Sequence, residues 1–288
     1  MNSISRKLFW LVGGAMLVLS VAGVAVLYRS EIAGIFDSIR SVRTELATPL
    51  EKTFSLPPPL RSQGSASDAL LTPNGVIAET NRQRILYGVA ELSENEILNA
   101  AALTKAKDIL ARQYFAHESP TGQNVQELVE GAGYEFLAVG ENLALGNYED
   151  DMVLVQAWMA SPGHRENILS PLFSEIGVGV VRGTFEGETT WVAVQEFAKP
   201  SSACVWPDVS LKESIDGNVQ ELDRQEQELA LRKQELDRMR AQHDPQYNQK
   251  AEEYNVLVAQ YNQLFEHTQA MIAQYNMEVT EFNRCVSG

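Results

Sequence analysis

Two of the four histidines in this 288-residue chain lie in segments that could place them at the edge of a cleft. His117 stands three residues before a proline, and His164 directly follows Pro162-Gly163, so both sit where the backbone direction is fixed. Glu141 lies between them in sequence. Neutral imidazole suits Zn²⁺ and similar metals, while a carboxylate can complete the coordination or activate a bound water. These residue types predict a His/Glu/His site.

The spacing of these residues shows that only the fold can assemble the site. Glu141 lies 24 residues after His117 and 23 residues before His164, so no single helix carries all three. We expect a ligand-binding cleft formed by His117, Glu141 and His164, with Asn142 beside them. His117 and His164 are the expected ligands of zinc or another divalent metal, and Glu141 is the candidate catalytic residue if the site is an enzyme's.

Several segments in a fixed order resemble the CAP superfamily of cysteine-rich secretory, antigen 5 and pathogenesis-related proteins, in its short bacterial form. The resemblance runs from about Thr72 to Pro200 and implies an α+β fold, the α-β-α sandwich of that superfamily. The motifs that carry it are Asn81–Arg84, His117-Glu118-Ser119-Pro120-Thr121-Gly122, Gly140-Glu141-Asn142, Ser161-Pro162-Gly163-His164-Arg165 and Ile176-Gly177-Val178-Gly179.

The resemblance also implies roles for individual residues. His117 matches the first histidine of the family cleft, Glu141 its Gly-Glu-Asn acid, and His164 its Gly-His-Arg histidine. Many members carry another acid in the helix after the first histidine. Glu127 and Glu130 are the nearby candidates for this second acid.

Composition excludes one class of partner. The chain has 23 basic and 38 acidic residues, which gives a net charge of -15. A field of that sign repels phosphate backbones, so we expect no nucleic acid partner. The apolar content of 44% supports a packed core.

The N-terminus predicts a membrane anchor. The segment from Leu8 to Tyr28 contains no charged residue, and as a helix it would span roughly 31 Å, the thickness of a bilayer core. A cleaved export signal is the alternative, but the apolar run is longer than is typical of one. Arg6 and Lys7 favour a cytoplasmic N-terminus. We therefore expect a single-pass membrane protein with its body outside the cytoplasm.

Composition divides the chain into four parts. Residues 1–29 form the tail and anchor, and residues 30–71 a juxtamembrane helix and a linker that includes Leu56-Pro57-Pro58-Pro59-Leu60. The CAP-like domain covers residues 72–203, and a helical hairpin covers residues 204–288. Within the domain, helices are expected from Thr72, which would cap the first one, from Ser93 to Arg112, where Ser93 and Glu96 would form a capping box, over Asn124–Glu130 and over Glu149–Ala160. A β-hairpin from Ile176 to Phe197 follows, and Gly177 and Gly179 on one face of its first strand would let another layer approach closely.

The C-terminal part has the heptad pattern of a coiled coil. Its second arm repeats apolar residues in a 4-3 alternation, and its first arm repeats them every seven residues. The seam residues are Tyr247, Ala251, Tyr254, Val258, Tyr261, Phe265, Thr268, Ile272, Tyr275, Val279 and Phe282 in the second arm, and Ile215, Leu222, Leu229 and Leu236 in the first. Pro245 separates the arms and predicts an antiparallel return.

The hairpin brings the two cysteines together. Cys204 and Cys285 bracket it, and arms of similar length place them at its open end. We therefore predict a disulfide, formed in an oxidising space outside the cytoplasm. Leu257, Leu264 and Met271 widen the apolar face of the second arm, which could pack on the CAP-like domain or pair two molecules as a homo-oligomer.

Three functions fit these patterns. The first is a membrane-anchored binding module whose cleft holds a small molecule, lipid, peptide or cell-wall fragment, with a divalent metal as a further expectation. The second is a metal-assisted hydrolase, similar to a peptidase, that uses Glu141 as general base. In the third, the coiled-coil hairpin is a scaffold and the CAP-like domain is a spacer.

Overall fold

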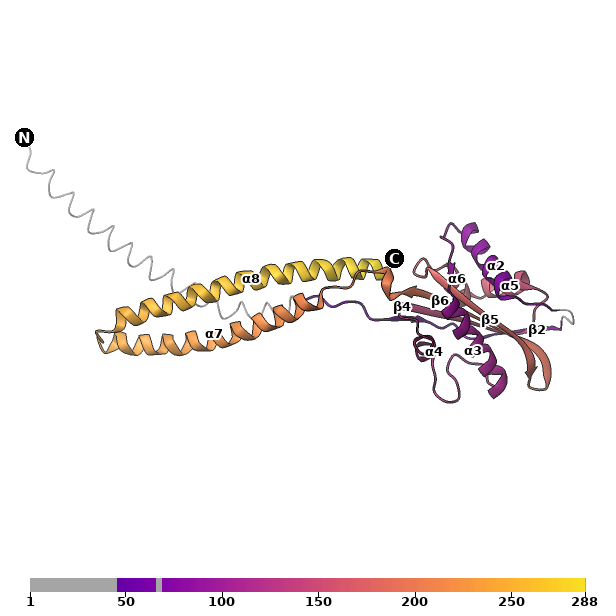
Figure 1. The fold of residues 1–288 in the computed structure, drawn as a ribbon, viewed down its shortest axis with the longest axis horizontal. Helices are drawn as coiled ribbons and strands as arrows, with labels where there is room; N and C mark the ends of the chain where they lie inside the picture. The colour runs from indigo at the N-terminus through magenta and orange to yellow at the C-terminus, as the bar shows by residue number, and fades with distance from the viewer. Residues whose placement is uncertain (1–45, 66–68, 288) are drawn as a thin grey trace, which may run out of the picture. The chain divides into compact units, whose positions relative to one another are not determined.

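The computed structural model describes residues 46–65 and 69–287 and divides the chain into two compact units. One unit contains residues 49–206 and 281–288, and the other contains the helical hairpin up to residue 280. The elements, most of them labelled in Figure 1, are β1 (Thr53–Ser55), β2 (Leu60–Ser65), α2 (Pro73–Leu86), β3 (Ser93–Glu94), α3 (Glu96–Arg112), α4 (Val125–Gly131), β4 (Phe136–Asn147), α5 (Asp151–Ala160), α6 (Pro162–Leu169), β5 (Glu175–Phe185), β6 (Glu188–Pro200), the short 3-10 helix η1 (Ser201–Ala203), α7 (Val209–Ala241) and α8 (Tyr247–Ser287).

The first unit is built on a mixed sheet with the order β1-β4-β6-β5-β3. Strands β4, β6 and β5 are antiparallel neighbours, while β1 and β2 both pair in parallel with the outer edge of β4. Figure 1 shows helices on both sides of the sheet, with α2, α5 and α6 on one side and α3 and α4 on the other. This unit therefore has the mixed α/β architecture expected from the sequence.

Alternate residues of the strands fill two separate cores. On the α2, α5 and α6 side, Ala138, Ala144, Ala193 and Phe197 pack around Trp158. On the α3 and α4 side, the buried strand residues include Val139, Leu143, Leu145, Val192, Val194 and Ala198. Because β4 is covered on both faces, its sequence lacks the polar alternation that marks a half-buried strand, and the strand was not expected from the pattern.

The N-terminal caps of the helices agree only in part with the caps expected from the sequence. Thr72 caps α2 as predicted, because its side chain accepts a hydrogen bond from the backbone of Gly75. The capping box assigned to Ser93 is wrong: the cap of α3 is Asn95, whose side chain accepts from the next helical turn, and Ser93 belongs to β3. Helix α6 was not predicted, although Pro162 opens it at a favoured first position.

One buried arginine fixes the segment that carries α6. The Arg84 guanidinium donates to the backbone oxygens of Ala90, Ile168, Ser170 and Phe173. Burial lowers the pKa of Arg84 to about 10, so the side chain stays charged at neutral pH. One of these carbonyl groups lies in the loop after α2, and the other three lie at the end of α6 and in the loop that follows it. The Arg84 cation bonds to all four and so sets the position of α6 against α2.

The segment expected to be a linker is part of the sheet. Residues 53–55 and 60–65 pair with β4, and residues 56–59, which include the three prolines, lie between the two short ladders. Proline cannot donate a ladder hydrogen bond, which explains why pairing stops there and resumes after Pro59. We call residues 55–60 the strap.

The hairpin matches its heptad pattern. Helices α7 and α8 pack through Leu222 and Leu229 against Tyr254 and Tyr261, and through Ile215 against residues further along α8, so they run antiparallel. The flanking side chains Leu257, Leu264 and Met271 are partly buried against this same seam.

The Cys204–Cys285 disulfide predicted from the sequence is present in the first unit, with its Cα atoms 5.8 Å apart. The predicted anchor and juxtamembrane helix lie in residues 1–45, outside the described part of the chain. Within the part that is described, no helix has the length and apolar character needed to span a membrane.

Two glycines allow α3 to approach the sheet. A Cβ on Gly177 would overlap the backbone of Leu98 and Asn99, and a Cβ on Gly179 would overlap that of Ala102. The close approach predicted for this face of β5 is therefore confirmed, and α3 is held directly on the strand.

We predict that Gly179→Ala lowers the free energy of unfolding by about 1–3 kcal/mol, because α3 must move away from β5. Urea unfolding followed by tryptophan fluorescence measures it. Gly131→Ala is the control, since a Cβ there meets no atom within 4 Å. Equal stability of the two variants would contradict the proposed contact.

Candidate functional site

His117 and Glu141, which were expected to share one cleft, are in direct contact. His117 lies in the loop after α3, and its Nδ1 is 2.5 Å from Oε1 of Glu141 on β4. The other ring nitrogen, Nε2, is 2.6 Å from the carbonyl oxygen of Pro57 in the strap. Lys105 of α3 donates to the backbone oxygen of His117 and so fixes the loop.

The partners of His117 determine where its protons lie. A carbonyl oxygen can only accept, so Nε2 carries a hydrogen that it donates to Pro57. The contact between Nδ1 and the Glu141 carboxyl group then also needs a proton between the two atoms. Both ring nitrogens are thus engaged, one by a buried acid and one by the strap.

The second acid of the site is Glu196, which the sequence analysis missed. It lies on β6 directly opposite Glu141 in the antiparallel register, so both side chains are on the α3 side of the sheet. Both residues are fully buried. Burial, followed by the charge of Glu141, raises the pKa of Glu196 well above its usual range, while Lys105 lowers it. We infer that Glu196 is protonated at neutral pH.

A signal for Glu196 exists in the sequence. It is a charged residue inside the otherwise uncharged run Trp191–Phe197, which the pattern assigned to a strand. A carboxyl group in the middle of a buried strand needs a partner. That partner could not be identified before the pairing of β4 with β6 was known.

His164 is buried at the start of α6 and is neutral. Its Nδ1 is 2.8 Å from the Ser161 hydroxyl oxygen, and its Nε2 has no hydrogen-bond partner. Burial and then the charge of His117 lower the pKa of His164 to about 4. His164 therefore bonds to Ser161 rather than to Glu141.

Asn142 and Asn167 connect β4 to α6. Asn142 donates to the His164 carbonyl oxygen and to the side chain of Gln195, and its own oxygen accepts from Asn167. Asn167 also donates to the carbonyl oxygen of Ser55. Asn142, expected beside the ligand, therefore holds the elements of the site together, whereas Asn167 reaches the strap.

Glu127 and Glu130, the expected second acid, lie elsewhere. Both are exposed on α4, and Glu130 pairs with Lys52 at 2.5 Å. The amphipathic character of α4 explains this placement: Val125, Leu128 and Val129 are its buried residues, so the two glutamates face outward. The acid that approaches Glu141 comes instead from β6.

The arrangement does not fit the expected metal. Both nitrogens of His117 are in hydrogen bonds, so neither lone pair is available to a cation. His164 has a single unpartnered nitrogen. Over residues 46–65 and 69–287, no group of three or more histidine, cysteine, aspartate or glutamate side chains is placed to hold a metal ion.

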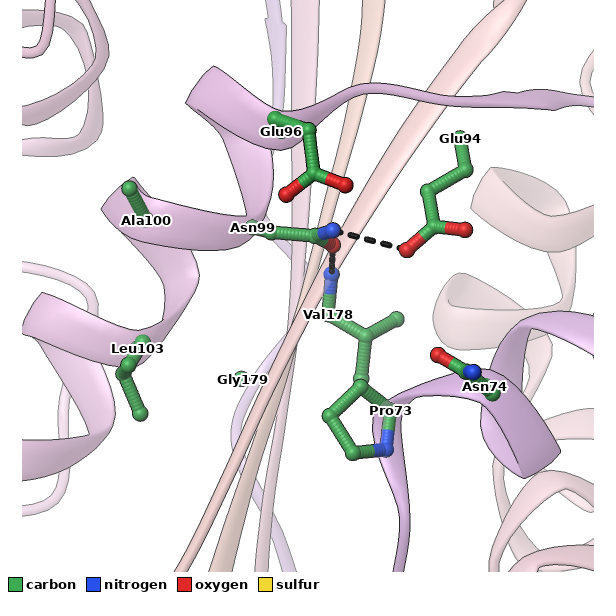
Figure 2. A pocket seen from close by; sticks show the side chains of 9 residues that line it. All are labelled: Pro73, Asn74, Glu94, Glu96, Asn99, Ala100, Leu103, Val178 and Gly179. Atoms are coloured by element: carbon green, nitrogen blue, oxygen red, sulfur yellow. Dashed lines mark hydrogen bonds between the residues drawn. The ribbon is translucent and has the colours of Figure 1, made fainter.

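A separate hollow lies between the start of α2 and α3, with a volume of about 410 Å³ (Figure 2). Its polar groups serve the fold. Asn99 donates to Glu94 and accepts from the backbone of Val178, as the dashed lines in Figure 2 show. These bonds hold α3 to β3 and β5, so the His/Glu cluster is the stronger candidate for a functional site.

The pKa of His164 predicts a pH dependence of stability. Between about pH 6.5 and 4 the unfolded chain binds a proton that the folded protein does not, so the free energy of unfolding falls as the pH falls. We expect a loss of at most about 3 kcal/mol from this residue. Urea unfolding at pH 7 and pH 4.5 should show a smaller pH effect in His164→Asn. The exposed His267→Asn is the control, and identical pH effects in all three proteins would refute the assignment.

Comparison with known proteins relates part of the first unit to a known family. Residues 77–197 match the family model of the cysteine-rich secretory protein family, CAP. The chain is 40% identical over 106 residues to an uncharacterized Bacillus subtilis protein, YkwD, covering 37% of this chain and 41% of YkwD. It is 32% identical over 103 residues to the uncharacterized B. subtilis membrane protein YlbC, covering 36% of this chain and 30% of YlbC.

A solved structure of an extracellular Bacillus anthracis protein with an SCP domain is 26% identical, with a TM-score of 0.39, over 44% of this chain and 40% of that protein. The chain spans less than half the length of the two B. subtilis relatives. The matched segment begins in α2 and ends in β6, and it includes His117, Glu141, His164 and Glu196. Residues 77–197 of this chain therefore form a domain of the CAP superfamily.

Proposed function

We propose that this protein is an extracytoplasmic binding protein whose CAP domain holds its ligand through hydrogen bonds to the cluster of His117, Glu141, His164 and Glu196, together with Asn167. The ligand belongs to the class of small molecules, peptides, lipids or cell-wall fragments. Binding without turnover is the proposed activity.

Unsatisfied polar atoms carry this proposal. Among the described residues, eight buried side-chain nitrogen or oxygen atoms have no hydrogen-bond partner. Two of the eight, Nε2 of His164 and Oδ1 of Asn167, belong to this cluster, and three more are oxygens of the carboxyl pair, in which protonated Glu196 is hydrogen-bonded to Glu141. Each such group costs about 1–3 kcal/mol. Buried polar atoms without partners that lie close together can serve as hydrogen-bond donors and acceptors for a ligand.

Geometry favours binding over hydrolysis. The alternative function needs a metal or water between two imidazoles, with Glu141 free to act as general base. In this structure Oε1 of Glu141 faces His117, and both nitrogens of His117 are engaged. Glu196 is protonated and cannot act as a base. We therefore propose recognition as the role of the cluster.

The disulfide and the relatives support a location outside the cytoplasm. Cys204 and Cys285 are bonded, and such bonds persist in oxidising compartments. YlbC is named a membrane protein, and the B. anthracis protein is described as extracellular. We propose that this chain is anchored through residues 8–28 with its CAP domain outside.

The hairpin is proposed as an attachment or oligomerisation arm. Its seam residues are covered within the hairpin, whereas Leu231 and Val256 are exposed. A homo-oligomer formed through this arm remains our proposal for the assembled state, as does the scaffold role of the coiled coil.

The binding role predicts that Glu196 lowers stability. Its pKa is raised in the folded protein, so its contribution to stability is fully present below about pH 4.5 and is lost as the pH rises above that value. Glu196→Gln removes the titration. We expect the variant to gain about 1–3 kcal/mol in the free energy of unfolding at pH 8 and less at pH 4.

Urea unfolding at the two pH values measures this difference. Glu188→Gln is the matched control, because Glu188 lies on the same strand and is exposed. A Glu196→Gln protein that is less stable at both pH values would show that Glu196 is a structural residue, and the proposed function would fail.

Metal analysis tests the alternative site. We expect wild-type protein dialysed against zinc and the His117→Ala/His164→Ala variant to retain equal, negligible metal, because the hydrogen bonds of His117 leave no nitrogen lone pair. Inductively coupled plasma mass spectrometry measures the content. One zinc ion per wild-type chain, lost in the variant, would contradict this expectation and favour the metal-assisted function.

A further inference from the structure

The strap passes over the His/Glu cluster between two short ladders. Ser55 is in register with Gly140, and Leu60 is in register with Ala144. The four residues between them therefore cross the position of Glu141 and its neighbours on β4. Pairing with β4 stops at Ser55, just before the position of Glu141, and resumes at Leu60, beyond it.

Two side chains of the site bind the backbone of the strap. His117 Nε2 donates to the carbonyl oxygen of Pro57 at 2.6 Å, and Asn167 Nδ2 donates to that of Ser55 at 3.1 Å. Both acceptors are backbone atoms, which any extended peptide presents. Proline keeps its backbone carbonyl acceptor but has no backbone N–H donor. A proline-containing segment therefore suits a surface that supplies hydrogen-bond donors.

The proline ring is also enclosed. Pro57 is buried, while its neighbours Leu56 and Pro58 are exposed. Gly163, at the start of α6, leaves the space for it: a Cβ at position 163 would lie 2.7 Å from Cβ of Pro57. The Pro57 ring is therefore enclosed by the shape of the site, while Leu60 at the end of the strap packs against the core on the α6 side.

These contacts have the features of peptide recognition. Parallel pairing on a strand edge supplies main-chain hydrogen bonds, and a pocket for one side chain supplies specificity. The strap also precedes the segment that matches the CAP family, which begins at residue 77. The CAP domain thus holds a piece of chain from outside the family segment in the manner of a ligand.

We propose that the outer edge of β4 is a binding groove for an extended, proline-containing peptide, and that the strap is its intramolecular occupant. This inference rests on the proposed function and names its ligand class. A peptide from another molecule binds when it replaces residues 55–60. Its proline carbonyl then accepts from His117, and the carbonyl two residues before the proline accepts from Asn167.

Tethering makes the strap a strong competitor. A covalently linked segment has an effective concentration of about a millimolar or more at its own site. The wild-type protein is therefore expected to bind a free peptide weakly, and removal of the strap is expected to reveal the groove.

The test uses the full chain with residues 55–60 replaced by Gly-Ser-Gly-Ser-Gly-Ser. The probe is a fluorescent peptide with the sequence of residues 53–60, Thr-Phe-Ser-Leu-Pro-Pro-Pro-Leu. We expect fluorescence anisotropy to give a Kd at least 10-fold lower for the replaced protein than for wild type. In the replaced protein, Asn167→Ala should weaken binding at least 5-fold. Asn74→Ala, in the separate hollow of Figure 2, should not change it.

Specificity is tested with the peptide itself. A probe with glycine in place of its first proline should bind at least 5-fold more weakly, because that proline corresponds to Pro57 beside Gly163. Should the six-residue replacement fail to fold, Pro57→Gly in the full chain is titrated in the same way. This variant keeps the chain length and loses the enclosed ring.

Two results would overturn the inference. One is the absence of peptide binding in a folded, strap-replaced protein. The other is binding that Asn167→Ala and the glycine probe leave unchanged. Either result together with a stabilising Glu196→Gln would leave the cluster as a binding site for a different ligand class. A destabilising Glu196→Gln would remove the proposed function itself.

Discussion

The burial of two carboxyl groups opposite each other on β4 and β6 is the constraint around which the CAP domain is arranged. Glu141 and Glu196 have no access to water, and two adjacent negative charges there would be very costly. The molecule responds by keeping Glu196 protonated and by placing the His117 imidazole against Glu141. Lys105, also buried, opposes the raised pKa of Glu196. The loop after α3, the register of the central strands and the strap all meet at this pair.

The two faces of the sheet contribute different parts of the site. The carboxyl pair lies on the α3 side, whereas Asn142 and Gln195 are on the α6 side and connect the strands to that helix. The groups join at the outer edge of β4, where His117 and Asn167 both reach the backbone of the strap. A sheet edge is the one part of such a domain where a polar cluster can face another chain while its supports stay packed. This location explains why recognition of a peptide backbone suits the fold.

The sequence predicted what local patterns determine and missed what strand pairing determines. The heptads of α7 and α8, the cap at Thr72 and the glycines facing α3 depend on neighbours along one element, and each was found in the structure. Contact between His117 and Glu141 was anticipated through family resemblance. Glu196 was missed because its partner is set by the β4–β6 register, and Glu127 and Glu130 were chosen by nearness in sequence. The strands in the proline-rich segment were missed because the composition of a linker says nothing about an open sheet edge.

The bond between Cys204 and Cys285 also determines what happens when the chain is cut. It joins residues 81 positions apart and therefore encloses α7, the turn at Asp244 and nearly all of α8 in one covalent ring. A protease that cleaves the turn once opens this ring without releasing a fragment. Both pieces remain attached until a reductant is added, so damage to the arm leaves the mass of the intact molecule almost unchanged. In an oxidising environment, a nicked molecule is retained as a single particle.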